Sequence, residues 1–538
     1  MKNMTAQKYV SSLRLLICLV IVLPAGAGLW FWRGRQPRRI HRDHAPTVAG
    51  EFEYLTKRFD FSPPYNPRLS RIRAQEDLDE LEWLLENRYS YLQLKGVNYK
   101  AALDSIRNSL GDGIHRSLFG YQLSKFIASF GDGHSRVASS SCRLQALCTG
   151  FPPFLVEETG GRFVVFKPDR SDFIDSNTPF LRAIDGIPVD SWLDVAGQFV
   201  ERGSPQYIRH HTVRNLRYLH CLRKEVGLAE PNSVEIELES TDGSLNTCIE
   251  LPLVEEKPIY GFWPRPEVEF TSWEDIRPES RVFPSNIAYL RFVMMTAEPG
   301  FLDGLIKAMN RFRSTEGLII DLRTNGGGRR APLQVLLPFF MAQTDPPRLV
   351  NVAAYRLGTE NIKENFEARY LYPASSSRWS KDEREVIGRF AGSFKPEWIP
   401  PEGRFSPWHY FVISPSKDER YYHYDKPVVI LMDRGNFSAT DIFLGGFKGL
   451  NNITLMGRPS GGGSGCTKEY RLAHSGIRVC LSRMASFQPN GQLYDGNGIR
   501  PDIVVEPAPT DFIGKTDTML DKALRAIDEK NNSLHSHP

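Results

Sequence analysis

The sequence predicts an α/β protein with three folded parts: a helical N-terminal domain, a β-rich middle module and an α/β core. Apolar residues recur at helical spacing between Leu78 and Phe130. Short apolar stretches separated by Gly, Pro, Asp and Asn turns follow between Phe151 and Val254. Strand and helix patterns then alternate from Ser285 to about Pro507, which is typical of an α/β core.

Length and composition are consistent with several globular domains. The chain has 538 residues, which corresponds to roughly three to four domains at about 150 residues each. Hydrophobic residues make up 41% and charged residues 24%, so a disordered or collagen-like chain is excluded. Lys and Arg number 67 and Asp and Glu 63, a net charge of +4. No long basic run lies beyond the N-terminal region, and we therefore expect no nucleic-acid partner.

An 18-residue apolar run, from Leu15 to Trp32, lies near the N-terminus between basic flanks. Residues 1–35 are therefore expected to be a signal peptide or a membrane anchor. Ala25-Gly26-Ala27 fits a cleavage site, whereas Trp30-Phe31-Trp32 fits the interfacial end of an anchor. Arginines just after the run favour the anchor. Either alternative predicts an extracytoplasmic body (periplasmic, cell-surface or secreted), membrane-anchored in the second case through residues 15–32.

Changes in pattern divide the rest of the chain. The expected parts are a linker (36–73), a helical N-terminal domain (74–145), a β-rich module (146–260), an α/β core (261–510) with an insertion (329–426), and a C-terminal helix and tail (511–538). The insertion is long and aromatic, which makes it a candidate cover for a cleft. Oligomeric state is not readable from these patterns.

The cysteines and histidines do not indicate a metal site or a cofactor. Six cysteines lie beyond the first apolar run: Cys142, Cys148, Cys221, Cys248, Cys466 and Cys480. Their spacings contain no CxxC pair and no ladder of Cys and His ligands, so no structural zinc is expected. Free thiols and disulfides both remain open, and the predicted export favours disulfides.

Three consecutive glycines follow a predicted buried strand. The strand Gly317–Leu322 leads into Gly326, Gly327 and Gly328, whose missing Cβ atoms would let backbone N–H groups approach a ligand closely. This suits an oxyanion hole or a phosphate cradle, and a tight turn is the third alternative. The phosphate alternative lacks the Lys-Ser/Thr of a P-loop.

A second strand leads into a serine at the start of a helix. Val428–Met432 reads as a strand, Gly435-Asn436 as a turn, and Ser438 as the first residue of a helix. Ser438 is either an N-cap or a nucleophile at the positive end of the helix dipole. In the second case the N–H of Ala439 could bind a developing oxyanion together with a glycine N–H.

A serine nucleophile needs a base, and two kinds of candidate are present. His134 lies in a glycine-flanked turn directly after a helix pattern, where it is either a catalytic base or a structural loop histidine. The other candidate is a lysine that follows Ser438 in the chain.

Together these stretches resemble the tail-specific (C-terminal processing) and tricorn-core serine peptidases. The resemblance rests on four motifs in order, Asp132 to Ser135, Asp321 to Gly328, Phe437 to Asp441 and Asp495 to Val505, and it covers roughly residues 74–528. It implies a crotonase-like catalytic core, a helical N-terminal domain and a PDZ-like middle module. Phe180 to Val189 resembles the strand and turn of a PDZ domain.

The resemblance also implies one of two catalytic designs. Members with a Ser–Lys dyad carry lysine in a loop that here reads Gly457 to Gly465 and has none; Lys448 and Lys468 do not match the motif. Tricorn-like members use a histidine. The resemblance therefore implies the following roles: Ser438 as nucleophile, His134 as base, Asp495 as the acid that orients it, and the backbone N–H groups of Gly327 and Ala439 as oxyanion donors.

The expected function is hydrolysis of protein or peptide substrates by a serine endopeptidase. A catalytically inactive ligand- or peptide-binding protein on the same fold is the alternative, and a middle module that recruits partner proteins is another. Asp441 is expected to stabilise the first turn of its helix. Arg329 and Arg330 are expected to be solvated surface residues, with a grip on a substrate carboxylate as the alternative.

Overall fold

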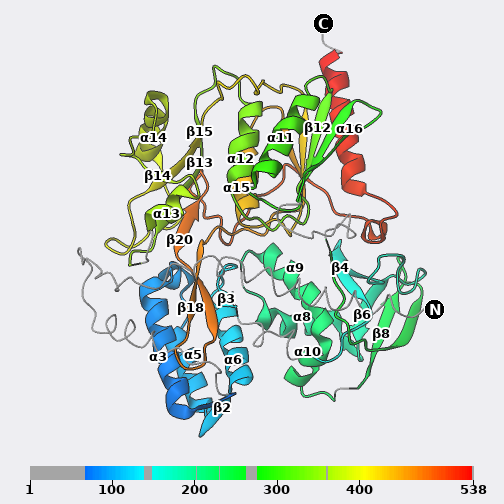
Figure 1. Ribbon diagram of the computed structural model, residues 1–538. Helices are drawn as coiled ribbons and strands as arrows, with labels where there is room; N and C mark the ends of the chain where they lie inside the picture. The colour runs from blue at the N-terminus through cyan, green and yellow to red at the C-terminus, as the bar shows by residue number, and fades with distance from the viewer. Residues whose placement is uncertain are drawn as a thin grey trace, which may run out of the picture.

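The computed structural model describes residues 67–138, 148–201, 203–229, 231–261, 276–358 and 362–535 (Figure 1). The predicted signal peptide or anchor and most of the linker lie outside these ranges, so both remain predictions. Within them, none of the helices combines the length and the apolar character needed to cross a bilayer.

A six-stranded sheet organises the α/β core. Its spatial order is β10 (Glu279–Val282), β11 (Ile287–Arg291), β12 (Gly317–Asp321), β16 (Val428–Met432), β17 (Ile453–Gly457) and β21 (Ile503–Val504). All neighbours are parallel except β10 and β11. Helices cover both faces (Figure 1): α11 (Pro299–Arg311), α12 (Ala331–Leu336) and α15 (Ala439–Phe447) on one, α16 (Thr518–His535) on the other.

Burial on both faces explains why these strands are apolar throughout. Along β12, Leu318 and Ile320 face the cluster that includes α11 and α15, whereas Ile319 faces α16. A strand covered on both sides has no polar face, and its sequence is therefore a continuous apolar run. β12 and β16 are direct parallel neighbours, with Leu318 opposite Val428. The chain segments that follow the two strands consequently emerge side by side.

The helical N-terminal domain consists of α3 (Arg71–Arg88), α4 (Leu92–Lys95), α5 (Tyr99–Ser109) and α6 (Arg116–Ala128), followed by β3 (Arg136–Val137). A hairpin from far along the chain, β18 (Thr467–Arg471) and β19 (Arg478–Ser482), pairs with β3 and packs on these helices (Figure 1). This pairing brings the end of α6 close to the loop that precedes β18.

The middle module combines a sheet with helices. The strands are β4 (Leu155–Thr159), β5 (Arg162–Phe166), β6 (Phe180–Ile184), β7 (Ile187–Pro188), β8 (Ser233–Glu239) and β9 (Asn246–Pro252). The helices are α8 (Val189–Ala196), η2 (Gly197–Phe199), α9 (Pro205–Asn215), η3 (Leu216–Tyr218) and α10 (Leu219–Glu225). A disulfide joins Cys148 to Cys221, as the preference for disulfides predicted. Cys248 and Cys466 carry free thiols, and Cys142 lies outside the described residues.

The insertion contributes three strands to a second antiparallel sheet, which β20 from the later part of the core completes. Its order is β14 (Tyr372–Pro373), β15 (His409–Ile413), β13 (Arg348–Tyr355) and β20 (Met484–Phe487). Helices α13 (Ile362–Glu367) and α14 (Lys381–Ser393) and the short η5 (Leu337–Phe340) complete this region.

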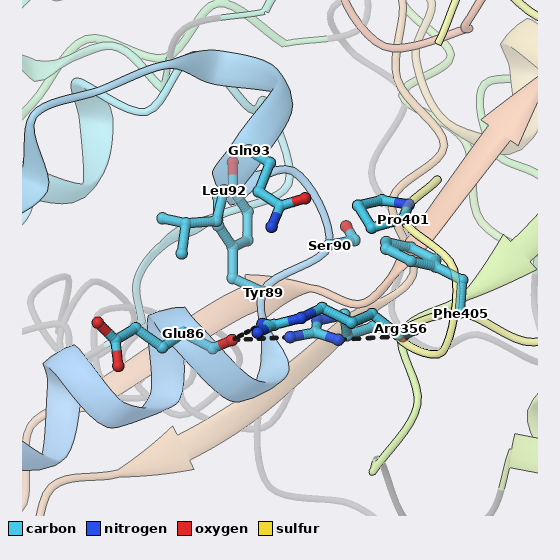
Figure 2. A pocket seen from close by; sticks show the side chains of 9 residues that line it. Glu86, Tyr89, Ser90, Leu92, Gln93, Arg356, Pro401 and Phe405 are labelled. Atoms are coloured by element: carbon cyan, nitrogen blue, oxygen red, sulfur yellow. Dashed lines mark hydrogen bonds between the residues drawn. The ribbon is translucent and has the colours of Figure 1, made fainter. Parts of the chain in front are cut away.

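The insertion docks on the C-terminal end of α3. Figure 2 shows Arg356 reaching the backbone oxygen of Glu86, to which its Nη2 donates a hydrogen bond of 2.7 Å. Arg404 donates to the same oxygen at 3.4 Å. Carbonyl groups in the last turn of a helix lack partners within the helix, and cationic donors satisfy them well. The small cavity at this joint holds only about 20 Å³.

Candidate active site

Ser438 lies in a strained turn between β16 and α15. Its backbone has φ 60° and ψ −117°, an unusual conformation for a residue other than glycine, and its side chain makes no capping hydrogen bond. Ser438 thus occupies the N-cap position of α15, but its hydroxyl does not cap the helix. The side-chain amide of Asn436 holds the turn against the neighbouring strand end by donating to the backbone oxygens of Leu322 and Asn325. Strain of this kind persists only where the surrounding structure enforces it, and it presents the hydroxyl away from the helix.

His134 lies in the turn between α6 and β3. Asp132 accepts a hydrogen bond from the backbone N–H of His134 (2.9 Å) and another from the hydroxyl of Ser135. Ser135 in turn accepts a hydrogen bond from the backbone N–H of Ser482 in β19 (3.0 Å). The histidine is thus positioned by the same hairpin that completes the helical domain.

The structure brings His134 and Ser438 together. Nε2 of His134 lies 3.1 Å from Oγ of Ser438, although 304 positions separate the two residues in the chain. The imidazole stacks on the ring of Phe437, with 4.5 Å between ring centroids and 24° between the ring planes. A nucleophile and a base within hydrogen-bond distance are the geometric requirement for general-base activation of a serine.

Burial keeps the imidazole of His134 neutral. Desolvation lowers its pKa to about 4, with smaller lowering contributions from Arg136 and Arg369 and an opposing one from Asp132. At neutral pH the ring is therefore unprotonated and has a lone pair that can accept a proton.

Asp495 does not contact the ring of His134 in this structure. Its Oδ2 accepts a hydrogen bond of 2.7 Å from Nζ of Lys95, and its side chain is fully buried. Burial raises the pKa of Asp495 to about 7, and Lys95 and the backbone N–H of Gly133 oppose this rise. The expected Asp495–His134 hydrogen bond is thus replaced by an ion pair. The physical reason is that a desolvated carboxylate takes a cation as its partner.

Nδ1 of His134 instead faces a backbone donor. The N–H of Gly465 points at it over 3.4 Å. The acid expected at this nitrogen is Asp495, whose Oδ1 is buried without a hydrogen-bond partner among the described residues.

One of the two expected oxyanion donors is already engaged. The N–H of Gly327 donates to Oδ1 of Asn325 at 3.0 Å, so in this conformation it does not point into an oxyanion hole as expected. Two further hydrogen bonds hold the Asn325 side chain in this place: it donates to the backbone oxygen of Phe292, just after β11, and accepts from the hydroxyl of Thr440 in α15. No described residue accepts a hydrogen bond from the N–H of Ala439, the second expected donor.

Gly327 is nevertheless needed for close packing. Its φ is 105°, and a Cβ atom there would lie only 2.8 Å from Cβ of Ser438 and 2.9 Å from the backbone nitrogen of Ala439. The glycine loop after β12 therefore rests directly against the serine turn after β16, as their parallel pairing requires.

Gly463 lies in the loop that carries the lysine in members with a Ser–Lys dyad. A Cβ on Gly463 would overlap the ring of Phe437 and lie 3.0 Å from Cε1 of His134. Lys448 is bound to Asp502 (2.7 Å), and Lys468 lies in β18. The imidazole and its aromatic support thus occupy the space next to the serine.

Asp441 anchors the glycine loop that packs on His134. It accepts hydrogen bonds from the N–H groups of Gly462 (3.3 Å) and Gly463 (3.0 Å) and from the hydroxyl of Ser460. Burial raises the pKa of Asp441 to about 7, and these donors oppose the rise. Its position in the first turn of α15 was predicted, but this loop contact was not.

Arg330 is not the solvated surface residue that the sequence suggested. Its side chain is buried and donates to Oδ1 of Asn351 (2.9 Å) and to Oγ of Ser464 (3.3 Å). The glycine turn points this residue into the interface between the core and the insertion. Arg329, by contrast, is exposed.

Sequence reasoning missed Asn325, Phe437 and Gly463 as supports of the site. Asn325 and Phe437 lie within the recognised motifs, but their roles come from contacts with distant segments. A signal for Gly463 was available, because a run of glycines without a turn pattern indicates close packing.

Comparison with known proteins indicates a similarity to one peptidase family. Residues 286–505 match the model of Peptidase family S41. The carboxy-terminal-processing protease of Bartonella bacilliformis is 31% identical over 102 residues. That match spans 19% of this chain and 23% of the relative, less than a quarter of its length.

Solved structures show the same fold over most of the chain. Mature CPAF is 17% identical with a TM-score of 0.56, and the match covers 86% of this chain and 96% of CPAF. Mature CPAF complexed with lactacystin is 16% identical with a TM-score of 0.55, and this match covers 86% of this chain and 98% of CPAF. At such identities the similarity concerns the fold alone.

Proposed function

We propose that the protein is a serine endopeptidase that hydrolyses protein or peptide substrates. The observation that carries the proposal is the 3.1 Å approach of His134 Nε2 to Oγ of Ser438 at a strained turn. Burial keeps the imidazole neutral, so its Nε2 can accept the hydroxyl proton of Ser438 when the ring proton is on Nδ1.

In the proposed reaction, Ser438 attacks the carbonyl carbon of the scissile peptide bond while His134 accepts the hydroxyl proton. The imidazolium then gives this proton to the leaving amine, and an acyl-enzyme remains. Water activated by the same imidazole releases the acyl group and restores Ser438. The unengaged N–H of Ala439 is the first donor for the oxyanion. Gly327 would become the second donor if its N–H turned away from Asn325.

Asp495 is proposed as the acid that supports His134. A base at Nε2 needs its ring proton on Nδ1, and a carboxylate that accepts this proton would hold that tautomer. Two observations support this role. Oδ1 of Asp495 is buried without a hydrogen-bond partner among the described residues. The carboxylate also interacts with the backbone N–H of Gly133, the residue next to His134. The ion pair with Lys95 opposes it, since the acid has to share its charge.

The setting of the reaction is part of the proposal. We infer an extracytoplasmic location, which the Cys148–Cys221 disulfide supports because such bonds persist in oxidising compartments. The proposed architecture has a crotonase-like core and a PDZ-like middle module. In the middle module, β4, β5, β6, β8 and β9 pair in this order, and α8 contacts β6 and β7. This arrangement supports the PDZ-like assignment.

Cleavage of unfolded casein by the soluble part from residue 67 onward tests the function. The wild type should cleave, and Ser438→Ala and His134→Ala should each lower kcat/KM by at least about 10³-fold. A fluorophosphonate probe should label the wild type but not Ser438→Ala. Retained cleavage in Ser438→Ala would refute the nucleophile assignment. A folded wild type that neither cleaves nor takes up the probe would favour the ligand-binding alternative.

A further inference from the structure

A cavity of about 330 Å³ lies between the helical domain and the middle module, outside the catalytic pair. One wall comes from α6 and β3, and the other from η2 and η3. Tyr121, Phe199 and Tyr218 line it, and the rings of Tyr121 and Phe199 lie 5.1 Å apart. The space is large enough for an amino-acid side chain, and its walls are partly aromatic.

The charged groups in this cavity are mainly basic. Arg136, Arg217 and Lys257 line it, together with a single carboxylate, that of Glu201. Arg136 donates to the backbone oxygen of His134 over 3.5 Å, a weak contact for a guanidinium. Across the described ranges no ion pair joins Arg136 or Arg217 to a carboxylate.

Arg217 is held in place by rings. Its guanidinium lies 5.0 Å from the ring centre of Tyr218 and 5.3 Å from that of Tyr260. Its buried Nε has no hydrogen-bond partner among the described residues. A guanidinium that stacks on aromatic rings is oriented by them, and its donors stay available for a planar anion.

The cavity adjoins the catalytic pair. Arg136 follows His134 by two residues, and its positive charge contributes to the low pKa of that imidazole. Glu201 interacts electrostatically with Tyr207, whose ring lies 4.7 Å from that of Phe437. Arg136 thus links the cavity to the turn that carries His134.

We propose that this cavity binds a carboxylate of the peptide substrate through Arg136 and Arg217 and thereby favours substrates that place a carboxylate there. This proposal rests on the proposed peptidase function. Guanidinium groups bind carboxylates by two parallel N–H···O bonds, which are strong where water is excluded. The carboxylate belongs either to an Asp or Glu side chain or to the C-terminus of the substrate, and the two sources share this chemistry.

Binding to the Ser438→Ala protein tests the site without requiring hydrolysis. The probes are fluorescent peptides in which one position at a time carries Glu or Gln, each with a free or an amidated C-terminus. Fluorescence anisotropy should show about tenfold tighter binding of the carboxylate-bearing member of at least one pair. Adding Arg217→Gln should reduce this ratio to below about twofold, whereas Arg182→Gln, an exposed arginine of β6, should leave it unchanged.

The pairs also distinguish the sources. A preference for Glu that persists with an amidated end assigns an acidic side chain, and a preference for the free end alone assigns the C-terminus. Equal binding of all pairs overturns the proposal, as does a preference that survives in both Arg217→Gln and Arg136→Gln. If thermal unfolding shows that Arg217→Gln does not fold, the carboxylate preference of Arg136→Gln is the test, and a preference that survives there overturns the proposal.

Hydrolysis is scored separately. Carboxylate preference in Ser438→Ala together with an inert wild type would refute the peptidase function and leave the binding site standing. Cleavage of casein by the wild type without any carboxylate preference would support the peptidase function and refute the binding site.

Discussion

Ser438 is held by the α/β core, whereas His134 is held by the helical N-terminal domain. The serine turn joins β16 to α15, and Asn436 fastens it to Leu322 at the end of the neighbouring strand β12. The histidine turn depends on Ser482 and Gly465, which lie more than 300 positions away. The proposed nucleophile is thus positioned mainly by local sheet geometry, and the proposed base by contacts between distant segments. Changes in the core should therefore affect stability first, and changes around His134 should affect activity first.

The largest expected effect concerns the buried charges under the glycine loop. Arg323 and Asp321 are fully buried and paired at 2.6 Å, and Arg323 also binds Asp517. Arg323 holds the pKa of Asp321 below its usual range against the desolvation that would raise it. Arg323→Met leaves Asp321 buried without its cation, so the free energy of unfolding should fall by about 3–5 kcal/mol, measured by urea denaturation.

An exposed Arg–Asp pair with the same spacing in the sequence serves as the matched control. Arg420 pairs with Asp418, two residues away, and both side chains are largely exposed. Arg420→Met should leave the unfolding free energy nearly unchanged, because an exposed ion pair is screened by solvent. Equal losses in the two variants would contradict the buried role of Arg323.

The second expected effect concerns the packing behind the base. In Gly463→Ala the new Cβ overlaps Phe437, so the ring and the stacked His134 have to shift. Displacement of a catalytic group by about 1 Å can cost about a hundredfold, and kcat/KM should fall by that factor. Gly388→Ala in α14, where nothing lies within 4 Å of the new Cβ, is the control and should retain full activity. Normal activity in Gly463→Ala would show that the stack is dispensable.

Asp495→Asn tests whether this acid supports His134 or only pairs with Lys95. If Asp495 supports His134, kcat/KM should fall at least about tenfold, because the amide cannot stabilise the imidazolium. Lys95→Met removes the cation that lowers the pKa of Asp495, so the acid is charged only at higher pH; the loss in this variant should therefore be recovered as the pH rises, whereas the loss in Asp495→Asn should persist. The same pH-independent loss in both variants would mean that Asp495 serves only its ion pair with Lys95. Steady-state kinetics on one fluorogenic peptide measures kcat/KM for the wild type, Asp495→Asn and Lys95→Met.

The smallest expected effect is in the pH profile. Asp495 has a pKa raised to about 7 and His134 one lowered to about 4, so as pH falls the acid is protonated first and the base last. kcat/KM should therefore drop partly near pH 7 and completely near pH 4. In Asp495→Asn only the step near pH 4 should remain. A single step near 6.5, the ordinary pKa of histidine, would contradict a desolvated His134.

Much of the core was predictable from the sequence because its signals are local. The apolar run that ends in glycines became β12 and its loop, and the run before Ser438 became β16. Strands buried on both faces have a recognisable composition, and glycines are required where two loops touch. The similarity to Peptidase family S41 could be anticipated from the same motifs, since they lie where the parallel strands end.

The tertiary structure alone decided which partners the charged and polar groups take. Nothing in the local sequence shows that Lys95 pairs with Asp495, that Gly327 donates to Asn325, or that Arg330 is buried. These contacts join segments that are distant in the chain, or depend on the exact direction of a loop. A buried charge or N–H takes whichever partner the packing brings close, because leaving it unpaired costs more than almost any alternative contact. The sequence by itself determined the elements and the reactive groups, whereas packing determined their partners.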